Sequence, residues 1–136
     1  MSFVNIKEIN MSKLNKYKSS QVSQKKELAD PREIIHELLT YLNQNLSEAI
    51  KNIDQGNLDN AKEKAKKAES VAYALQNCLN MREGGEIAKN LNYLYRHIRF
   101  AAKSLLEQEK TELLTSAHFV SNEILEGWKG MNSSVA

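Results

Sequence analysis

The sequence predicts an all-α protein, an antiparallel four-helix bundle that follows a flexible N-terminal arm. Three observations support this prediction. The chain of 136 residues contains one proline and five glycines, so few residues can end a helix or form a tight turn. Apolar residues recur at three- and four-residue steps along most of the chain. The breaks between these periodic segments are short, and short connections place successive helices antiparallel.

Residues 1–26 are rich in Ser, Asn, Gln and Lys, and their apolar residues keep no sustained period. We therefore expect this segment to be a flexible arm. A chain of this length suffices for one hydrophobic core, so residues 27–130 are predicted to form a single helical domain and residues 131–136 a disordered tail. Met11 is an alternative start of the natural chain.

The first helix is predicted to begin at Pro31. Asp30 provides an N-cap carboxylate, proline fits the first helical position, and Glu33 favours the first turn. Gly56-Asn57 then provides a helix stop followed by a new cap, so the next helix returns antiparallel. The apolar stripe of this first helix consists of Ile34, Ile35, Leu38, Leu39, Leu42, Leu46, Ala49, Ile50 and Ile53.

The second helix, starting at Leu58, has an apolar stripe made mostly of alanine. Small side chains let a neighbouring helix approach closely, which we take as the main role of each alanine, or they leave a shallow groove that a partner can fill. Lysines on the other faces alternate with glutamates, a pattern typical of a solvated surface. The stripe consists of Leu58, Ala61, Ala65, Ala68, Ala72, Leu75 and Leu79.

Gly84-Gly85 separates the second helix from a third that begins at Glu86, because two residues free to adopt positive φ can end one helix and start the next. One helix over residues 86–129 would be about 65 Å long, out of scale with this chain, so we expect a break within residues 107–110. The third stripe consists of Ile87, Leu91, Leu94, Ile98, Ala101 and Leu105. The fourth consists of Leu113, Leu114, Ala117, Val120, Ile124 and Trp128.

No motif indicates catalysis, a cofactor or a metal site. His36, His97 and His118 fall on different predicted helices. Glu33 and His36 form one copy of the Glu-x-x-His motif that di-metal carboxylate bundles use twice. Cys78 is a lone cysteine and suits a small buried hydrophobe. We therefore do not expect this protein to be an enzyme. A metal-carboxylate enzyme is an alternative, and it rests only on Glu33 and His36.

Charge and hydropathy indicate which partners and which cell compartment to expect for this protein. The chain has 19 basic and 17 acidic residues, so no strong overall field attracts nucleic acid. No stretch of about 18 apolar residues occurs, and residues 1–20 lack the apolar core of a secretory signal, so we expect no membrane insertion. Together with the single cysteine, these features favour a cytoplasmic protein.

Residues 79–95 read Leu-Asn-Met-Arg-Glu-Gly-Gly-Glu-Ile-Ala-Lys-Asn-Leu-Asn-Tyr-Leu-Tyr. This segment resembles the signature of the flagellar export chaperone FliS family, a Leu-Asp-x-x-x-Gly-Gly-Glu-Ile-Ala turn before a helix with Asn-Leu and Leu-Tyr pairs. Only the aspartate differs, being Asn80 here. Other landmarks follow in the family's order, and the resemblance spans Tyr17 to Trp128. It departs at residues 38–41, Leu-Leu-Thr-Tyr, where the family has Leu-Tyr-Asp-Gly.

The resemblance implies a cytoplasmic chaperone that binds the C-terminal segment of flagellin, prevents its premature polymerisation and assists its delivery to the flagellar export gate. A different helical client, such as an anti-sigma factor, is an alternative. Binding would use exposed apolar positions on the second and third helices and two residues of the arm, with part of this set serving the core instead. We expect a monomer or weak homodimer. The predicted partner-binding residues are Tyr17, Val22, Ala68, Ala72, Leu75, Ile87, Leu91, Leu94 and Tyr95.

Overall fold

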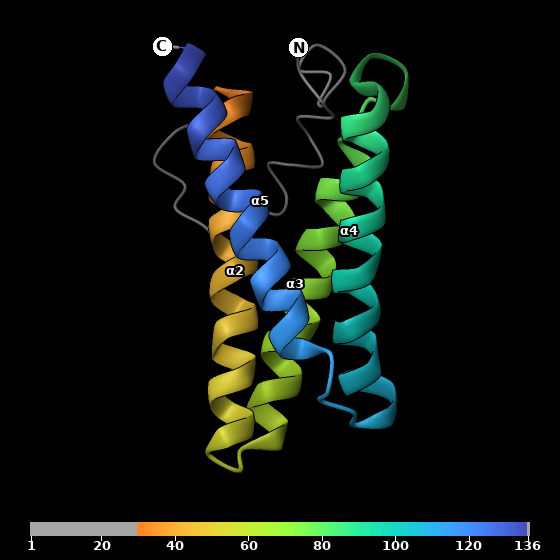
Figure 1. Cartoon of the computed structure of the whole chain (residues 1–136). Helices are drawn as coiled ribbons and strands as arrows, with labels where there is room; N and C mark the ends of the chain where they lie inside the picture. The colour runs from red at the N-terminus through yellow and green to blue at the C-terminus, as the bar shows by residue number, and fades with distance from the viewer. Residues whose placement is uncertain (1–29, 136) are drawn as a thin grey trace.

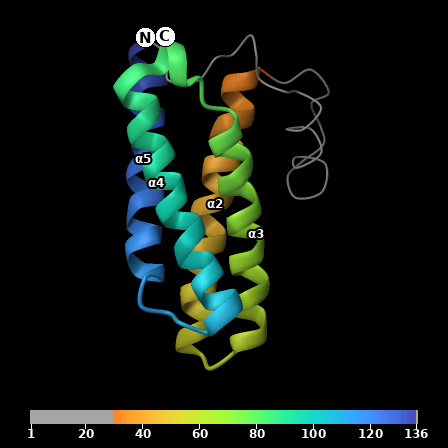
Figure 2. The same ribbon diagram turned by 90° about the vertical axis from the view of Figure 1, so that its right-hand side faces the viewer.

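The computed structural model describes residues 30–135, which form four helices and no strand. The helices are α2 (Pro31–Asp54), α3 (Leu58–Asn77), α4 (Met81–Gln108) and α5 (Leu114–Val135). They run up and down beside one another, with α5 inclined across the front of the bundle (Figures 1 and 2). This arrangement confirms the predicted all-α bundle. The predicted arm, residues 1–26, lies outside the described residues.

The first two helices begin and end where their local sequence signals place them. The Asp30 carboxylate accepts a hydrogen bond from the Arg32 N–H at 2.9 Å, and Pro31 occupies the start of α2. Gly56 has φ +75°, the left-handed conformation that ends a helix, and Asn57 then caps α3. The short turn between them makes α2 and α3 antiparallel neighbours.

All four helices contribute to the main hydrophobic core, in which α3 lies between α2 and α4. Helix α5 packs more extensively against α2 than against α4. Within the interface of α2 and α5, the Asn43 amide donates a hydrogen bond to the Ser121 hydroxyl at 3.0 Å. The contact between α4 and α5 is the least extensive of the four pairings between neighbouring helices.

The alanine stripe of α3 is packed rather than open. Ala61, Ala65, Ala68 and Ala72 have no exposed surface, because α2 and α4 approach α3 from its two sides. Close helix packing is therefore the role of these alanines, as the main interpretation of the sequence held. The alternative, that they line an open groove, is wrong for this state of the chain.

A kink in α4 occupies the Gly84-Gly85 segment. Asn80 caps a first turn by accepting hydrogen bonds from the N–H groups of Arg82 and Glu83, both at 3.1 Å. Gly85 then has φ +55° and ψ −132°, and the helix continues beyond it. Helical structure therefore begins at Met81, one turn before the predicted start at Glu86. Of the two glycines, which are both free to adopt positive φ, only Gly85 does so.

The break between the last two helices lies within the predicted range, residues 107–110. Helix α4 ends at Gln108 and is capped by Glu109 in the left-handed conformation, with φ 56°. Helix α5 continues to Val135, so most of the segment predicted to be a disordered tail is helical instead. Within residues 30–135, no helix is both long enough and apolar enough to cross a bilayer.

Candidate partner-binding surface

The hydrophobic core is least completely buried beside the C-terminal half of α5. Leu91 of α4 is 8% exposed, and Ile124, Leu125 and Trp128 of α5 are 7%, 6% and 4% exposed. Every other buried apolar residue is at most 2% exposed. The core is thus most nearly open where α5 inclines away from α4 in Figure 1.

Further apolar side chains border this part of the core. Leu94 and Val120 are partly buried and pack against the main core. Ile87, in the first turn after Gly85, is 44% exposed. We refer to this strip as the α4/α5 seam. It consists of Ile87, Leu91, Leu94, Val120, Ile124 and Trp128.

The structure separates the predicted partner-binding residues into two groups. Ala68, Ala72, Leu75 and Tyr95 are at most 2% exposed, so the expectation that they lie at the surface is wrong. They are buried because α3 packs against α2 on one side and α4 on the other, which places these side chains in the main core. Their role in binding would require the bundle to open, and it stays a prediction.

The other predicted residues lie on the seam or outside the described chain. Ile87 and Leu94 are accessible, Leu91 lies between them at the edge of the core, and all three belong to the seam. Tyr17 and Val22 lie outside the described residues. The partner-binding role of all five stays a prediction.

Sequence reasoning did not assign Val120, Ile124 and Trp128 to the candidate site, although their spacing placed them on one stripe of the last helix. Spacing identifies the apolar face of a helix, but it does not identify the neighbour that this face meets. It also overlooked Tyr93 and Phe100 of α4, which are 71% and 62% exposed. Their exposure could have been predicted from the sequence, because both residues fall outside the apolar stripe of α4.

A polar network holds α4 in place against α3. The Arg99 guanidinium donates hydrogen bonds to the Glu69 carboxylate at 2.8 Å and to the Gln76 side-chain oxygen at 2.9 Å. The Gln76 amide in turn donates to Asn92 at 2.7 Å. The α4 side of the seam is therefore built on a helix whose position is fixed by directional bonds as well as by packing.

Tyr95 is a structural residue of the core. Its side chain is 1% exposed. Burial raises the pKa of the phenol well above its ordinary value, and the charge of the nearby Cys78 raises this pKa further. The phenol is therefore uncharged at any physiological pH, and its ring serves packing rather than acid–base chemistry.

A hollow between α2 and α3 has a polar lining. Its volume is about 560 Å³, and its lining includes His36, Tyr41 and Lys67. Lys64 lies 3.0 Å from Glu48 there, and the hydrogen bond between them raises the pKa of the Lys64 ammonium. This mixture of charges suits water better than an apolar segment.

The three histidines lie apart, as the sequence indicated. His36 lines the hollow between α2 and α3, and His97 lies 3.1 Å from the Ser116 hydroxyl, between α4 and α5. His118 is a partly buried residue of α5. In the described part of the chain, no three His, Cys, Asp or Glu side chains gather closely enough to hold a metal ion.

Comparison with known proteins adds evidence of a different kind. A family model described as "Flagellar protein FliS" matches residues 11–135 of the chain. The flagellar secretion chaperone FliS of Vibrio cholerae is 28% identical over 115 residues, which cover 85% of each chain. The residues matched by the family model include the Gly84-Gly85 kink and the seam.

Proposed function

Since this chain belongs to the FliS family of flagellar proteins, we propose that it is a cytoplasmic export chaperone for flagellin. It binds the C-terminal segment of newly made flagellin, prevents premature polymerisation and accompanies this client to the export gate. The observation that carries the proposal is the family match over residues 11–135, together with the similarity to the flagellar secretion chaperone of Vibrio cholerae.

The α4/α5 seam supports this proposal physically. A client segment that is disordered before assembly can bind as an amphipathic helix, with apolar side chains at three- and four-residue steps inserted between two helices. Ile87 and Leu94 offer accessible apolar surface, and the edge of the core lies directly behind them at Leu91. Ordering a flexible client costs free energy, so the interface has to be long and mostly apolar to offset that cost.

The direct test compares two forms of flagellin. The full protein is mixed with flagellin that carries or lacks its C-terminal segment, and binding is measured by isothermal titration calorimetry. We expect binding to the complete form and none to the truncated form. Equal affinity for both forms would contradict the proposal. Selective capture of a different helical client from the source cytoplasm would instead favour the alternative function.

A substitution locates the binding surface. Ile87→Ser removes exposed apolar surface from the seam, and we expect it to weaken flagellin binding about tenfold or more, since a well-placed apolar anchor contributes over about 1 kcal/mol. Ile53→Ser is the matched control, because Ile53 is a partly buried isoleucine near the opposite end of the bundle. Unfolding curves show whether either variant is less stable. Equal losses of affinity would place the client elsewhere.

A further inference from the structure

The outward face of α4 bears a hollow with a basic and aromatic lining, which we call the basic hollow. Its volume is about 480 Å³, a size usual for small-molecule sites. Two aromatic rings, two guanidinium groups, an ammonium group and an imidazole line it, and none of the described carboxylates does. These residues are Tyr93, Arg96, His97, Arg99, Phe100 and Lys103. The lining suits an anion that also has a flat apolar part.

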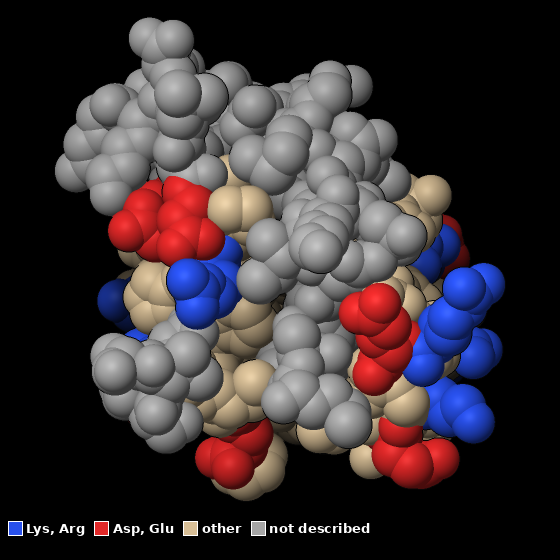
Figure 3. Space-filling view, turned by 90° about the horizontal axis from the view of Figure 1, so that it is seen from above, with Lys and Arg blue, Asp and Glu red and all other residues tan. Residues whose placement is uncertain are grey.

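Two of the cations in this lining have no carboxylate partner. Arg96 and Lys103 are both exposed, and neither forms an ion pair within residues 30–135. Arg99 is bound instead to two side chains of α3, which fixes its position. Figure 3 shows basic side chains gathered on the α4 side of the molecule. An anion in the basic hollow therefore meets positive charge that the described part of the chain leaves unneutralised.

The exposed ring of Phe100 lies between the two unpaired cations. Phe100 follows Arg96 by four residues and precedes Lys103 by three, so the three side chains are neighbours on one face of α4. The same ring also lines a smaller hollow of about 290 Å³. The other residues that line the smaller hollow are Ser104, Gln108, Lys110, Glu112 and Leu113. The Phe100 ring is therefore an apolar stacking surface that two adjoining hollows share.

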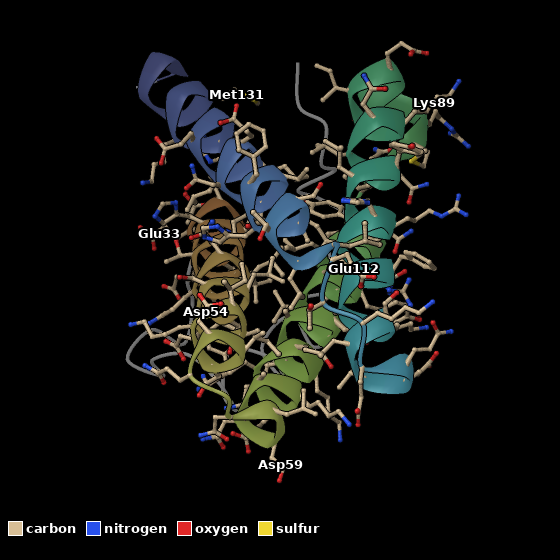
Figure 4. All side chains as sticks on the ribbon, turned by 60° about the horizontal axis from the view of Figure 1, so that its bottom comes forward. Glu33, Asp54, Asp59, Lys89, Glu112 and Met131 are labelled. Atoms are coloured by element: carbon tan, nitrogen blue, oxygen red, sulfur yellow. The ribbon has the colours of Figure 1, made fainter. Side chains whose placement is uncertain are left out.

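Carboxylates limit the length of this basic surface. Glu107 is exposed one turn beyond Lys103, and Glu112 lines the smaller hollow. Toward the other end of α4, the Lys89 ammonium lies 4.0 Å from the Glu86 carboxylate. Figure 4 shows Lys89 near the start of α4 and Glu112 beside the turn that follows this helix. The unneutralised positive charge is therefore confined to about 15 Å along the helix, which suits a short ligand.

We propose that the basic hollow binds a free nucleotide, a nucleoside diphosphate or triphosphate whose base stacks on the Phe100 ring. The phosphates contact Arg96 and Lys103, because a guanidinium binds two phosphate oxygens at once and an ammonium adds a second positive charge. The base lies on the side of the smaller hollow, where the Ser104 hydroxyl and the Gln108 amide are available to its polar edge. Glu112 repels phosphate from that side, which fixes the orientation of the ligand.

A free nucleotide fits this face better than a longer polyanion or an acidic peptide does. A long single-stranded nucleic acid would bring further phosphates against Glu107 and Glu112. An acidic peptide neutralises the cations, but it has no planar group between its carboxylates to cover the Phe100 ring. The site is independent of the proposed function, because it shares no residue with the α4/α5 seam and its test uses no flagellin.

The first part of the test compares ligands on the full chain by isothermal titration calorimetry at low ionic strength. We expect ATP to bind with a dissociation constant below about 1 mM. Adenosine and inorganic tripolyphosphate bind at least about tenfold more weakly, because each has only one half of the required chemistry. Added salt weakens the binding of ATP. A ten-residue glutamate peptide and a ten-nucleotide uridylate strand bind no more tightly than ATP.

The second part locates the site with a charge variant. Arg96→Gln combined with Lys103→Gln removes both unpaired cations, and we expect ATP affinity to fall at least about tenfold. Arg82→Gln combined with Lys51→Gln is the matched control, because it removes one exposed arginine and one exposed lysine that line neither hollow. The control leaves ATP affinity unchanged. Circular dichroism shows whether each variant keeps its helical content.

A ring variant tests the stacking. Phe100→Leu keeps an apolar side chain but removes the ring, and we expect ATP affinity to fall about fivefold or more. Phe119→Leu, at a similarly exposed phenylalanine of α5, leaves it unchanged. Three results would overturn the proposal: no ATP binding below about 1 mM, ATP binding no tighter than that of adenosine or tripolyphosphate, or equal losses in the variants and their controls. Tighter binding of the uridylate strand or of the glutamate peptide than of ATP would also overturn it, in favour of a single-stranded nucleic acid or an acidic protein segment.

Discussion

The guanidinium of Arg99 on α4 lies 4.7 Å from the centre of the Tyr73 ring on α3. The same group donates hydrogen bonds to Glu69 and Gln76, so one side chain joins the two helices through three different interactions. The side chains of Arg99 and Glu69 are 23% and 19% exposed, which limits screening by water. The position of α4 relative to α3 therefore depends strongly on Arg99.

Arg99→Ala is expected to lower the free energy of unfolding by about 2–3 kcal/mol. The substitution removes two charge-assisted hydrogen bonds and leaves the Glu69 carboxylate half-buried without its partner. Arg99→Lys keeps the charge but not the planar fork, so it costs less. Urea denaturation followed by circular dichroism measures both. Arg96→Ala, at an exposed arginine on the same helix, should change stability by no more than about 0.5 kcal/mol. Equal effects at the two arginines would contradict this account.

The buried phenol of Tyr95 makes stability depend on alkaline pH. Burial raises its pKa in the folded chain, whereas in the unfolded chain it titrates near its ordinary value of about 10. Above about pH 10, the unfolded state has therefore released a proton that the folded state keeps, and stability falls as pH rises. This group alone contributes a slope of up to about 1.4 kcal/mol per pH unit.

Tyr95→Phe removes that slope, while the raised pKa of Lys64 adds a fall in the same direction that both proteins share. The measurement is the free energy of unfolding at several values between about pH 9 and about pH 11. Tyr93→Phe, at an exposed tyrosine, controls for the loss of a tyrosine as such. If the plots of unfolding free energy against pH are parallel for the unmodified protein and Tyr95→Phe, the Tyr95 phenol is not the source of the pH dependence.

Position 85 requires glycine because of its backbone conformation, and not because a larger side chain would lack space. A Cβ atom built there meets nothing within 4 Å, but φ +55° with ψ −132° is a region that other residues rarely adopt. We expect Gly85→Ala to cost about 1–3 kcal/mol. Gly127→Ala is the matched control, because Gly127 lies in helical conformation in α5 with equally open space and should gain about 0.5–1 kcal/mol. Differential scanning calorimetry distinguishes opposite shifts in melting temperature, and shifts of the same sign would contradict the argument.

The sequence was sufficient to predict those features of the fold that depend on residues close together along the chain. Asp30, Pro31 and Gly56 act through their own backbone and caps, so the starts and ends of the first two helices could be predicted. The break near Glu109 followed from the length of the remaining chain. The helical turn before Gly85 was not predicted, although its signal is equally local, because the Asn80 side chain caps the N–H groups of Arg82 and Glu83.

The candidate site was harder to predict because it depends on which helices meet. Leu91 and Tyr95 were both predicted to bind a partner, yet only Leu91 reaches the edge of the core. The difference arises from the position of α3 between α2 and α4, which no local pattern encodes. The contribution of Ile124 to the seam likewise depends on how α5 inclines over the bundle (Figure 1).

A substitution at Ala68 distinguishes most clearly between two interpretations of α3, a closely packed helix and the floor of an open groove. Ala68 has no exposed surface and belongs to the main core cluster. Ala68→Leu therefore forces a larger side chain between closely packed helices, and we expect it to lower the free energy of unfolding by about 1–3 kcal/mol. Ser47→Leu, the control on the exposed face of α2, should stay within about 0.5 kcal/mol. Chemical denaturation of both variants measures these changes.

The same substitution also tests the binding role predicted for Ala68 from the sequence. If Ala68 lined an open groove, leucine would leave stability unchanged and alter flagellin binding directly. A packed Ala68 predicts the opposite pattern, in which affinity measured per folded molecule is retained while stability falls. Titration calorimetry corrected for the folded fraction separates the two, because overpacking acts on the folding equilibrium and a blocked groove acts on the complex.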